Sequence, residues 1–170
     1  MPFAVPWTAL TGAAFNRSFV QFHWAQRANF QRDRWILDFA VFVDGQAAGF
    51  QDLNAVDFPV VRTVGTGSWL GREFQRKGVG KLMRQAVLAL AFDHLGAEIA
   101  TSGAFLDNAA SNRVSEAVGY EPNGLDRIAP QGTAREHLRY RLTLERWRSQ
   151  PRPEVEVEGL EGCLDLFGLG

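Results

Sequence analysis

The chain has a single cysteine, Cys163, among its 170 residues. One cysteine can form no disulfide within the chain and can build no cysteine-rich zinc site, and this scarcity is typical of a reducing compartment. No apolar run approaches the about 20 residues of a membrane-spanning helix, and no basic segment follows Met1 as in a signal peptide. These absences predict a cytoplasmic protein with no membrane partner and no metal.

Neither sign of charge dominates. The sequence has 18 Lys and Arg against 19 Asp and Glu, a formal net charge of −1, so it lacks the broad positive field that binds nucleic acid. A hydrophobic content of 46% is enough for one core in a chain of this length. We expect one domain at residues 1–150, and a C-terminal tail at residues 151–170 that packs on this domain or on a partner.

Apolar periodicity predicts the secondary structure of the first half. Phenylalanines at helical spacing indicate an amphipathic helix, and Asp44-Gly45 is a strong hairpin turn signal. Gly65 and Gly67 lie inside a predicted strand, where glycine marks a bulge or a close backbone approach. The expected elements are a helix at Thr11–Ala28, strands at Trp35–Asp44, Gln46–Leu53 and Val60–Leu70, and a helix from Val79 to Leu95.

The second half continues with a short apolar segment and a helix that ends at Gly119. A strand on each side of the Val79–Leu95 helix implies a parallel pair, because a crossover of this length returns the chain in the same direction. The helix then begins at the carboxyl end of the preceding strand. The expected elements are a strand at Ala97–Phe105, a helix at Asp107–Val118, a short strand at Tyr120–Asn123 and a longer strand at His137–Arg146.

A local cluster of positive charge lies at the start of the Val79–Leu95 helix. A helix N-terminus carries unpaired N–H groups and a partial positive charge, and glycines allow an anion to approach them closely. Gly78 and Gly80 have this position, and three basic side chains surround them: Arg76, Lys77 and Lys81. The pattern matches neither the P-loop motif nor G-x-G-x-x-G. It predicts a phosphate-bearing ligand, the alternative being a solvated basic helix start.

The run Gln75-Arg76-Lys77-Gly78-Val79-Gly80 resembles the Q/R-x-x-G-x-G/A signature of the GNAT superfamily of acyl-coenzyme A-dependent N-acyltransferases. Asn108-Ala109-Ala110-Ser111 and Gly119-Tyr120 match the family's later motifs in the correct order, over about 35–146. The N-x-x-S form is most similar to the ribosomal-protein N-terminal acetyltransferase branch. The resemblance implies an α/β (α+β) fold, a mixed and mostly antiparallel sheet with a splayed parallel pair at its centre and flanking helices.

The resemblance also implies the reaction, which is direct attack by a primary amine, on a protein N-terminus or a small molecule, on the thioester of acetyl-coenzyme A. Alternatives are a non-catalytic acyl-coenzyme A-binding module, or a donor such as succinyl-coenzyme A whose carboxylate Arg62 or Arg72 would hold. The residues implied in coenzyme A binding are Trp69, Leu70, Gln75, Arg76, Lys77, Gly78, Val79, Gly80, Lys81, Asn108 and Ser111.

Four catalytic positions follow from the family pattern. A bulge near Leu70 would free a backbone N–H to polarise the thioester carbonyl. Ser111 would return a proton to the thiolate and Asn108 would orient the pantetheine, whereas Ser115 occupies the position at which many relatives have a tyrosine. The sequence leaves the general base open among Asp52, Asp57, Glu73, His137 and a water chain.

Other residues have structural alternatives. We expect His23 and His94 to be packing residues on helix faces, and the tryptophans to line an acceptor pocket or the core: Trp7, Trp24, Trp35 and Trp69. The family's first strand is missing from residues 1–10, because Pro2 and Pro6 cannot donate to a ladder. The edge of Trp35–Asp44 should therefore be covered by the tail or, more readily, by the second subunit of a homodimer.

Overall fold

The computed structural model describes residues 9–169. A six-stranded sheet with the strand order β1-β2-β3-β4-β6-β5 forms its centre. The strands are β1 (Arg34–Val43), β2 (Gln46–Val56), β3 (Thr63–Leu70), β4 (Ile99–Phe105), β5 (Glu121–Ile128) and β6 (Arg135–Thr143). The helices are α1 (Gly12–Ala28), α2 (Phe58–Val61), α3 (Val79–Ala89), α4 (Ala109–Val118) and α5 (Leu144–Arg148), with short turns at Arg72–Phe74, Leu90–His94, Pro130–Gly132 and Glu161–Phe167.

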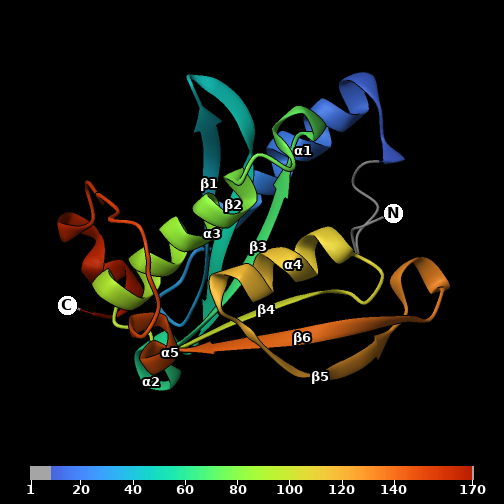
Figure 1. The fold of residues 1–170 in the computed structure, drawn as a ribbon. Coiled ribbons are helices and arrows are strands. Elements are labelled where there is room, and N and C mark those ends of the chain that lie inside the picture. The colour runs from blue at the N-terminus through green and yellow to red at the C-terminus, as the bar shows by residue number, and fades with distance from the viewer. Residues whose placement is uncertain (1–8, 170) are drawn as a thin grey trace.

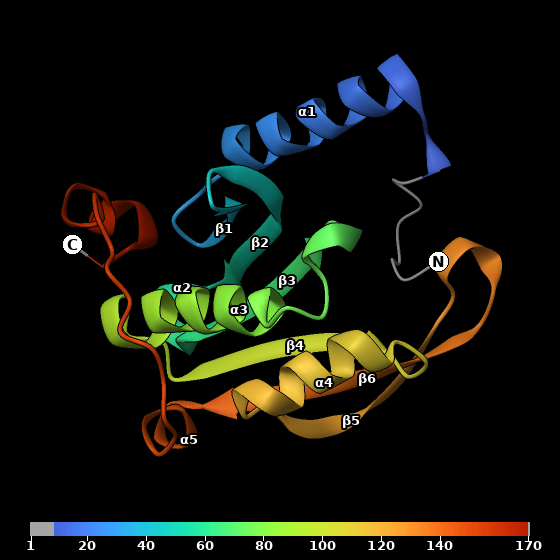
Figure 2. The same cartoon turned by 45° about the horizontal axis from the view of Figure 1, so that its top comes forward.

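The two central strands separate soon after they pair. β3 and β4 are parallel and pair from Thr63↔Ile99 to Gly65↔Thr101, while the other neighbouring strands are antiparallel. Beyond that point β3 continues to Leu70 away from β4, and the two halves of the sheet diverge (Figure 1). α1 covers one face, and α3 and α4 lie together on the other (Figure 2). The expected fold class, with its splayed parallel pair, is confirmed.

The expected bulge in β3 is wrong. The β2–β3 register is continuous from Gly49↔Leu70 to Asn54↔Gly65. The glycines instead permit a close approach of side chains from β2, since a Cβ atom at Gly65 would overlap Asn54 and one at Gly67 would overlap the carboxylate of Asp52. The splay therefore arises because β3 and β4 stop pairing, and not because β3 is distorted.

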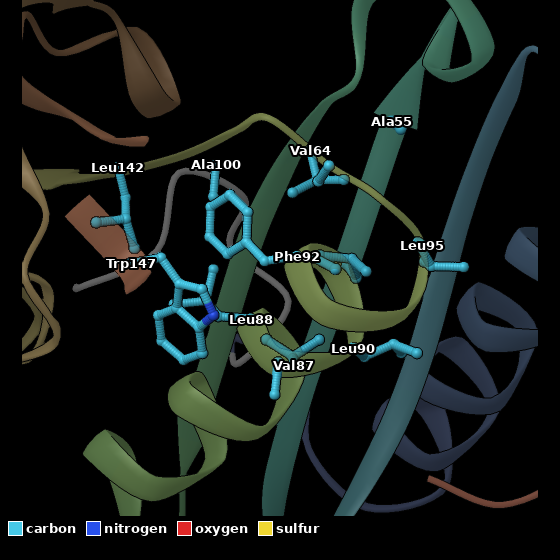
Figure 3. Close-up of a cluster of buried hydrophobic side chains, with 14 of the residues drawn as sticks. Ala55, Val64, Val87, Leu88, Leu90, Phe92, Leu95, Ala100, Leu142 and Trp147 are labelled. Carbon is cyan, nitrogen blue, oxygen red and sulfur yellow. The ribbon is translucent and has the colours of Figure 1, made fainter. Parts of the chain in front are cut away.

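The core lies between the sheet and α3. Apolar residues of α3 and the following π-helical turn, Leu90–His94, pack with Leu142 and Trp147 (Figure 3). The rings of Phe92 and Trp147 stack with centroids 5.7 Å apart, and the indole N–H donates to Asp93 at 3.3 Å. The sequence predicted one helix through Leu95, whose N–H instead donates to the Leu90 carbonyl, closing a wider turn.

Several strand boundaries differ from the predicted ones, and three of them have clear local features. Val60 and Val61 belong to the short helix α2 that begins after Asp57, so β3 starts later than expected. β6 ends at Thr143, whose hydroxyl caps α5 by accepting from the Arg146 N–H at 3.2 Å. β5 runs beyond Asn123 to Ile128, with a register shift against β6.

The C-terminal tail packs against the beginning of β1. The ring of Phe167 lies edge-on to Trp35 at 5.1 Å and to Phe30 at 5.6 Å. Arg32 Nε donates to the Asp165 carbonyl at 2.7 Å. Farther along β1, Phe42 is 63% exposed, and within residues 9–169 the outer edge of β1 has no strand partner. A second subunit at this edge stays a prediction, and the missing first strand lies mostly outside the described residues.

Removing the Phe167 ring should loosen the tail. We expect Phe167→Ala to lower the free energy of unfolding by about 3 kcal/mol, because it leaves a cavity beside the buried Trp35 indole. Denaturant unfolding followed by tryptophan fluorescence measures the change. Leu166→Ala is the matched control, since that side chain is 49% exposed and its loss should cost less than about 0.5 kcal/mol. Equal effects of the two substitutions would contradict the packing described.

Candidate functional site

A cavity of about 880 Å³ opens where β3 and β4 diverge. Its wall comes from both faces of the sheet, with residues of α1 on one side and of α3 and α4 on the other. Trp69, Asn108, Ser111 and His137 are predicted site residues that line it. The splay thus brings together side chains that are far apart in the sequence.

The α1 side of the cavity is aromatic. Phe15, Phe19 and Phe22 face it from α1, and the ring of Phe19 lies 6.2 Å from that of Trp69. The remaining tryptophans are elsewhere: Trp35 is in the core, Trp24 is 64% exposed outside the wall, and Trp7 lies outside the described residues. Among the described residues, the aromatic part of the cavity wall therefore has one tryptophan and is built mainly by phenylalanines.

Asp52 is the carboxylate in this wall. Its Oδ1 accepts hydrogen bonds from Asn54 Nδ2 at 2.8 Å and from the Gly67 N–H at 3.1 Å. Burial raises the pKa of Asp52, against the opposing effects of these hydrogen bonds and of Arg84, because a desolvated carboxyl resists ionisation. A carboxylate with a raised pKa is suited to accept a proton near neutral pH.

Of the other base candidates, only His137 lies in the cavity wall, where it packs over Gly103. Asp57 precedes the short helix α2 and is exposed, and Glu73 is exposed in the turn after β3. Neither lines the cavity. His94, predicted to pack on a helix face, is exposed.

The sequence interpretation missed a histidine–carboxylate pair. His23 of α1 lines the cavity, and its Nδ1 is 2.8 Å from Oδ2 of Asp38. Asp38 stands opposite Asp52 in the β1–β2 register, and its charge adds to the rise in the pKa of Asp52. The sequence signal that could have identified His23 is its spacing four residues after Phe19, because residues four apart lie on the same side of a helix. Here that side of α1 faces the cavity.

Arg84 was also missed. It is 3% exposed and lines the cavity from α3. Its Nε donates to Gln51 Oε1 at 3.4 Å, Nη1 to Ser102 Oγ at 2.9 Å and Nη2 to Ser68 Oγ at 2.9 Å. The guanidinium therefore connects β2, β3 and β4 across the splay. The sequence signal that could have identified Arg84 is its position as a charged residue within the apolar stripe of α3, between Met83 and Val87.

The loop before α3 has the geometry of an anion site. Gly78 is the N-cap with φ 84°, so no side chain covers the first N–H groups of α3. Arg76 has φ 60°, a left-handed conformation that is costly for arginine. Gln75 Nε2 donates to the Leu70 carbonyl at 3.0 Å, which fixes the loop to the end of β3, while Lys77 and Lys81 are exposed beside it. These residues fit a pyrophosphate.

Two serines of α4 have different surroundings. The Ser111 N–H donates to the side chain of Asn108, the N-cap, at 3.2 Å, and both residues line the cavity. Ser115 is 1% exposed and does not line it, and its hydroxyl has no partner within the described part of the chain. The start of α3 lies beside α4, since a Cβ atom at Gly80 would be 3.4 Å from Val114.

No helix in residues 9–169 is long and apolar enough to span a bilayer. The same residues contain no group of three or more His, Cys, Asp or Glu side chains placed to hold a metal ion.

The raised pKa of Asp52 makes stability depend on pH. Because the folded state holds this proton more tightly than the unfolded chain, stability falls as pH rises from the ordinary value of 3.8 through the raised one. Asp52→Asn should therefore raise the free energy of unfolding at pH 7, and this gain should vanish below pH 3.8. Denaturant unfolding at both pH values tests this, with the exposed Glu156→Gln as control. A loss of stability at pH 7 would contradict it.

Comparison with known proteins adds independent evidence. A family model described as an acetyltransferase (GNAT) domain matches residues 1–121. Mycobacterium smegmatis RimJ in complex with CoA-disulfide superposes with a TM-score of 0.72 at 21% identity, over 84% of this chain and 70% of RimJ. RimL, a ribosomal alpha-N-protein acetyltransferase in complex with coenzyme A, superposes with a TM-score of 0.66 at 20% sequence identity, over 80% of this chain and 75% of RimL. Spermidine N-acetyltransferase SpeG from Vibrio cholerae superposes with a TM-score of 0.65 at 15% sequence identity, over 80% of each chain.

At these identities the structures establish the fold, and the family match carries the assignment. The match covers more than half of the sequence, including β1 to α4 and the loop before α3. The chain is therefore a member of the GNAT acetyltransferase family.

Proposed function

We propose that the protein transfers an acetyl group from acetyl-coenzyme A to a primary amine, on a protein N-terminus or a small molecule. The observation that carries the proposal is the cavity in the splay, whose wall includes Trp69, near the loop before α3, and Asp52 with its raised pKa. RimL acts on a protein N-terminus and SpeG on spermidine, so both acceptor classes remain in the proposal. The balanced charge and single cysteine support a cytoplasmic location.

The coenzyme A-binding residues form one path in the proposal. Residues 75–81 would hold the pyrophosphate with the N–H groups at Gly78, Val79 and Gly80 and with the nearby cations. Trp69 and Leu70 at the end of β3, with Asn108 and Ser111 at the start of α4, would flank the pantetheine. The path therefore leads from the loop into the splay, where the thioester has to meet the amine.

Three groups would carry out the transfer. Asp52 would accept the proton of the attacking amine, with His137 or the His23–Asp38 pair as alternatives at the same wall. A backbone N–H at Trp69 or Leu70 would donate to the thioester carbonyl from the side of β3 that faces the splay. Ser111 would return a proton to the departing thiolate. Arg62 and Arg72, considered for an acidic acyl group, do not line the cavity.

Turnover separates an enzyme from a binding module. Release of free coenzyme A from acetyl-coenzyme A should require both the protein and an amine, in a panel that includes N-terminal peptides and polyamines. Binding of acetyl-coenzyme A without release, across the whole panel, would favour the non-catalytic alternative.

Substitution of Arg76 tests the loop. Arg76→Gly removes a cation from the proposed pyrophosphate site and relieves a left-handed backbone at φ 60°. We expect coenzyme A affinity to fall about tenfold, the value of one charge-assisted hydrogen bond, while stability stays within about 1 kcal/mol. Calorimetry and thermal melts measure both, with the exposed Arg148→Gln as the matched control. Unchanged affinity in Arg76→Gly would exclude this loop as the pyrophosphate site.

The two serines of α4 should differ in their effect on turnover. Ser111→Ala should lower kcat about a hundredfold, because it removes the proposed proton donor while its backbone N–H still binds the Asn108 cap. Ser115→Ala should leave kcat unchanged and stability equal or higher, because it deletes a buried hydroxyl that lacks a partner. Steady-state kinetics of both variants decide the matter, and the reverse pattern would assign the role to Ser115.

A further inference from the structure

Arg84 is a buried cation whose hydrogen bonds all go to neutral oxygens. Its bonds reach Gln51, Ser68 and Ser102, it also interacts with the hydroxyl of Tyr120, and among residues 9–169 it forms no ion pair. Asp52 acts on it through space without a bond, since Arg84 contributes to lowering the pKa of that carboxyl. Burying a guanidinium costs several kcal/mol when no bonded counter-charge offsets it. A cation held in this way is available to a negative charge that arrives from outside.

The position of Arg84 relative to the sheet indicates which charge that is. Gln51 and Asp52 are successive residues of β2, so their side chains point to opposite faces. Asp52 faces α1, where the His23–Asp38 pair lies, and Gln51 faces α3 and accepts from Arg84. The proton acceptor and the cation therefore stand on opposite sides of the splay.

The cation belongs to the coenzyme A side. Arg84 follows Gly80 by four residues, so both lie on one face of α3. A Cβ atom at Gly80 would lie 3.4 Å from Val114 on α4 and 3.5 Å from Leu70 at the end of β3, so this residue of the proposed pyrophosphate loop is close to both elements. A thioester that enters the splay from this loop would reach Arg84 before it reaches the aromatic wall of α1.

We propose, on the basis of the acetyl transfer proposed above, that Arg84 is a catalytic residue that stabilises the thiolate of coenzyme A as it leaves. The amine nitrogen attacks the thioester carbonyl carbon and loses its proton to Asp52. The C–S bond breaks, the electron pair passes to sulfur, and the acetyl group stays on nitrogen. Arg84 donates hydrogen bonds to the sulfur and keeps its own protons, because a guanidinium does not deprotonate in proteins. Ser111 then relays a proton from solvent to the thiolate, so that its own hydroxyl is restored, and Asp52 releases the amine proton to solvent.

This role accounts for the surroundings of Arg84. Neutral partners leave its charge unquenched before the reaction, so its interaction with the substrate strengthens as negative charge develops on sulfur. Ser115, at the position where many relatives have a tyrosine, lies outside the cavity wall and cannot serve the thiolate from there.

Titration of bound coenzyme A is the direct test. The ultraviolet absorbance of the thiolate is followed against pH for coenzyme A on the wild-type protein and in free solution. Asp52 and Tyr120 are the titratable groups electrostatically coupled to Arg84, so a titration with desulfo-coenzyme A supplies the blank.

We expect at least about tenfold more thiolate on the protein at a given pH, as for an opposite charge in contact. Arg84→Met should abolish the excess and Arg84→Lys should keep part of it. This wild-type comparison holds even if a variant fails to fold.

Turnover provides the second readout. With acetyl-coenzyme A, Arg84→Met should lower kcat about a hundredfold and leave the dissociation constant within about twofold, while the exposed Arg148→Gln changes neither. The loss should be the same with succinyl-coenzyme A. A loss confined to succinyl-coenzyme A would mean that Arg84 binds an acyl carboxylate, and equal thiolate fractions on and off the protein would likewise overturn the proposal. Failure of the wild-type protein to bind coenzyme A would instead overturn the proposed function.

Discussion

The short pairing between β3 and β4 is the constraint on which the rest of the structure depends. Two central strands that pair from Thr63↔Ile99 to Gly65↔Thr101 and then part leave backbone and space in the middle of a sheet. The antiparallel partners on the outer sides, β2 and β6, hold each strand in place along its remaining length. The gap is therefore rigid, and a cavity forms without any distortion of β3.

Charge is distributed unevenly around this gap. One face carries Asp38 and Asp52 opposite each other with His23 against the first, and the other face carries Arg84. Desolvation makes these interactions stronger than they would be at the surface. Glycines at positions 65, 67 and 103 leave room for Asn54, Asp52 and His137, so small residues in the strands decide where the polar side chains stand.

The local elements and the glycine-containing loop before α3 could be predicted because their signals are local. Gly78 and Gly80 at the start of an apolar periodic segment describe a helix N-terminus whatever surrounds it, and Asn108 as a cap depends on its neighbours alone. Predictions that required a comparison between distant segments were less successful. The bulge near Leu70 is absent. His23 was interpreted from its own helix and Arg84 was not singled out, because the strands that give them partners are distant in the sequence.

The sequence by itself determined the order of strands and helices, the parallel crossover through α3, the glycine N-cap of α3 and the family. Periodicity, turn residues and motif spacing are short-range properties that the chain carries before it folds. The tertiary structure alone decided that β3 and β4 part after Gly65, that Asp52 is the desolvated carboxylate among several candidates, and that Arg84 reaches Ser68 and Ser102. The burial and the hydrogen-bond partners of a side chain depend on which surfaces of the protein pack together. The residue pattern along one segment does not specify the segment that packs against it.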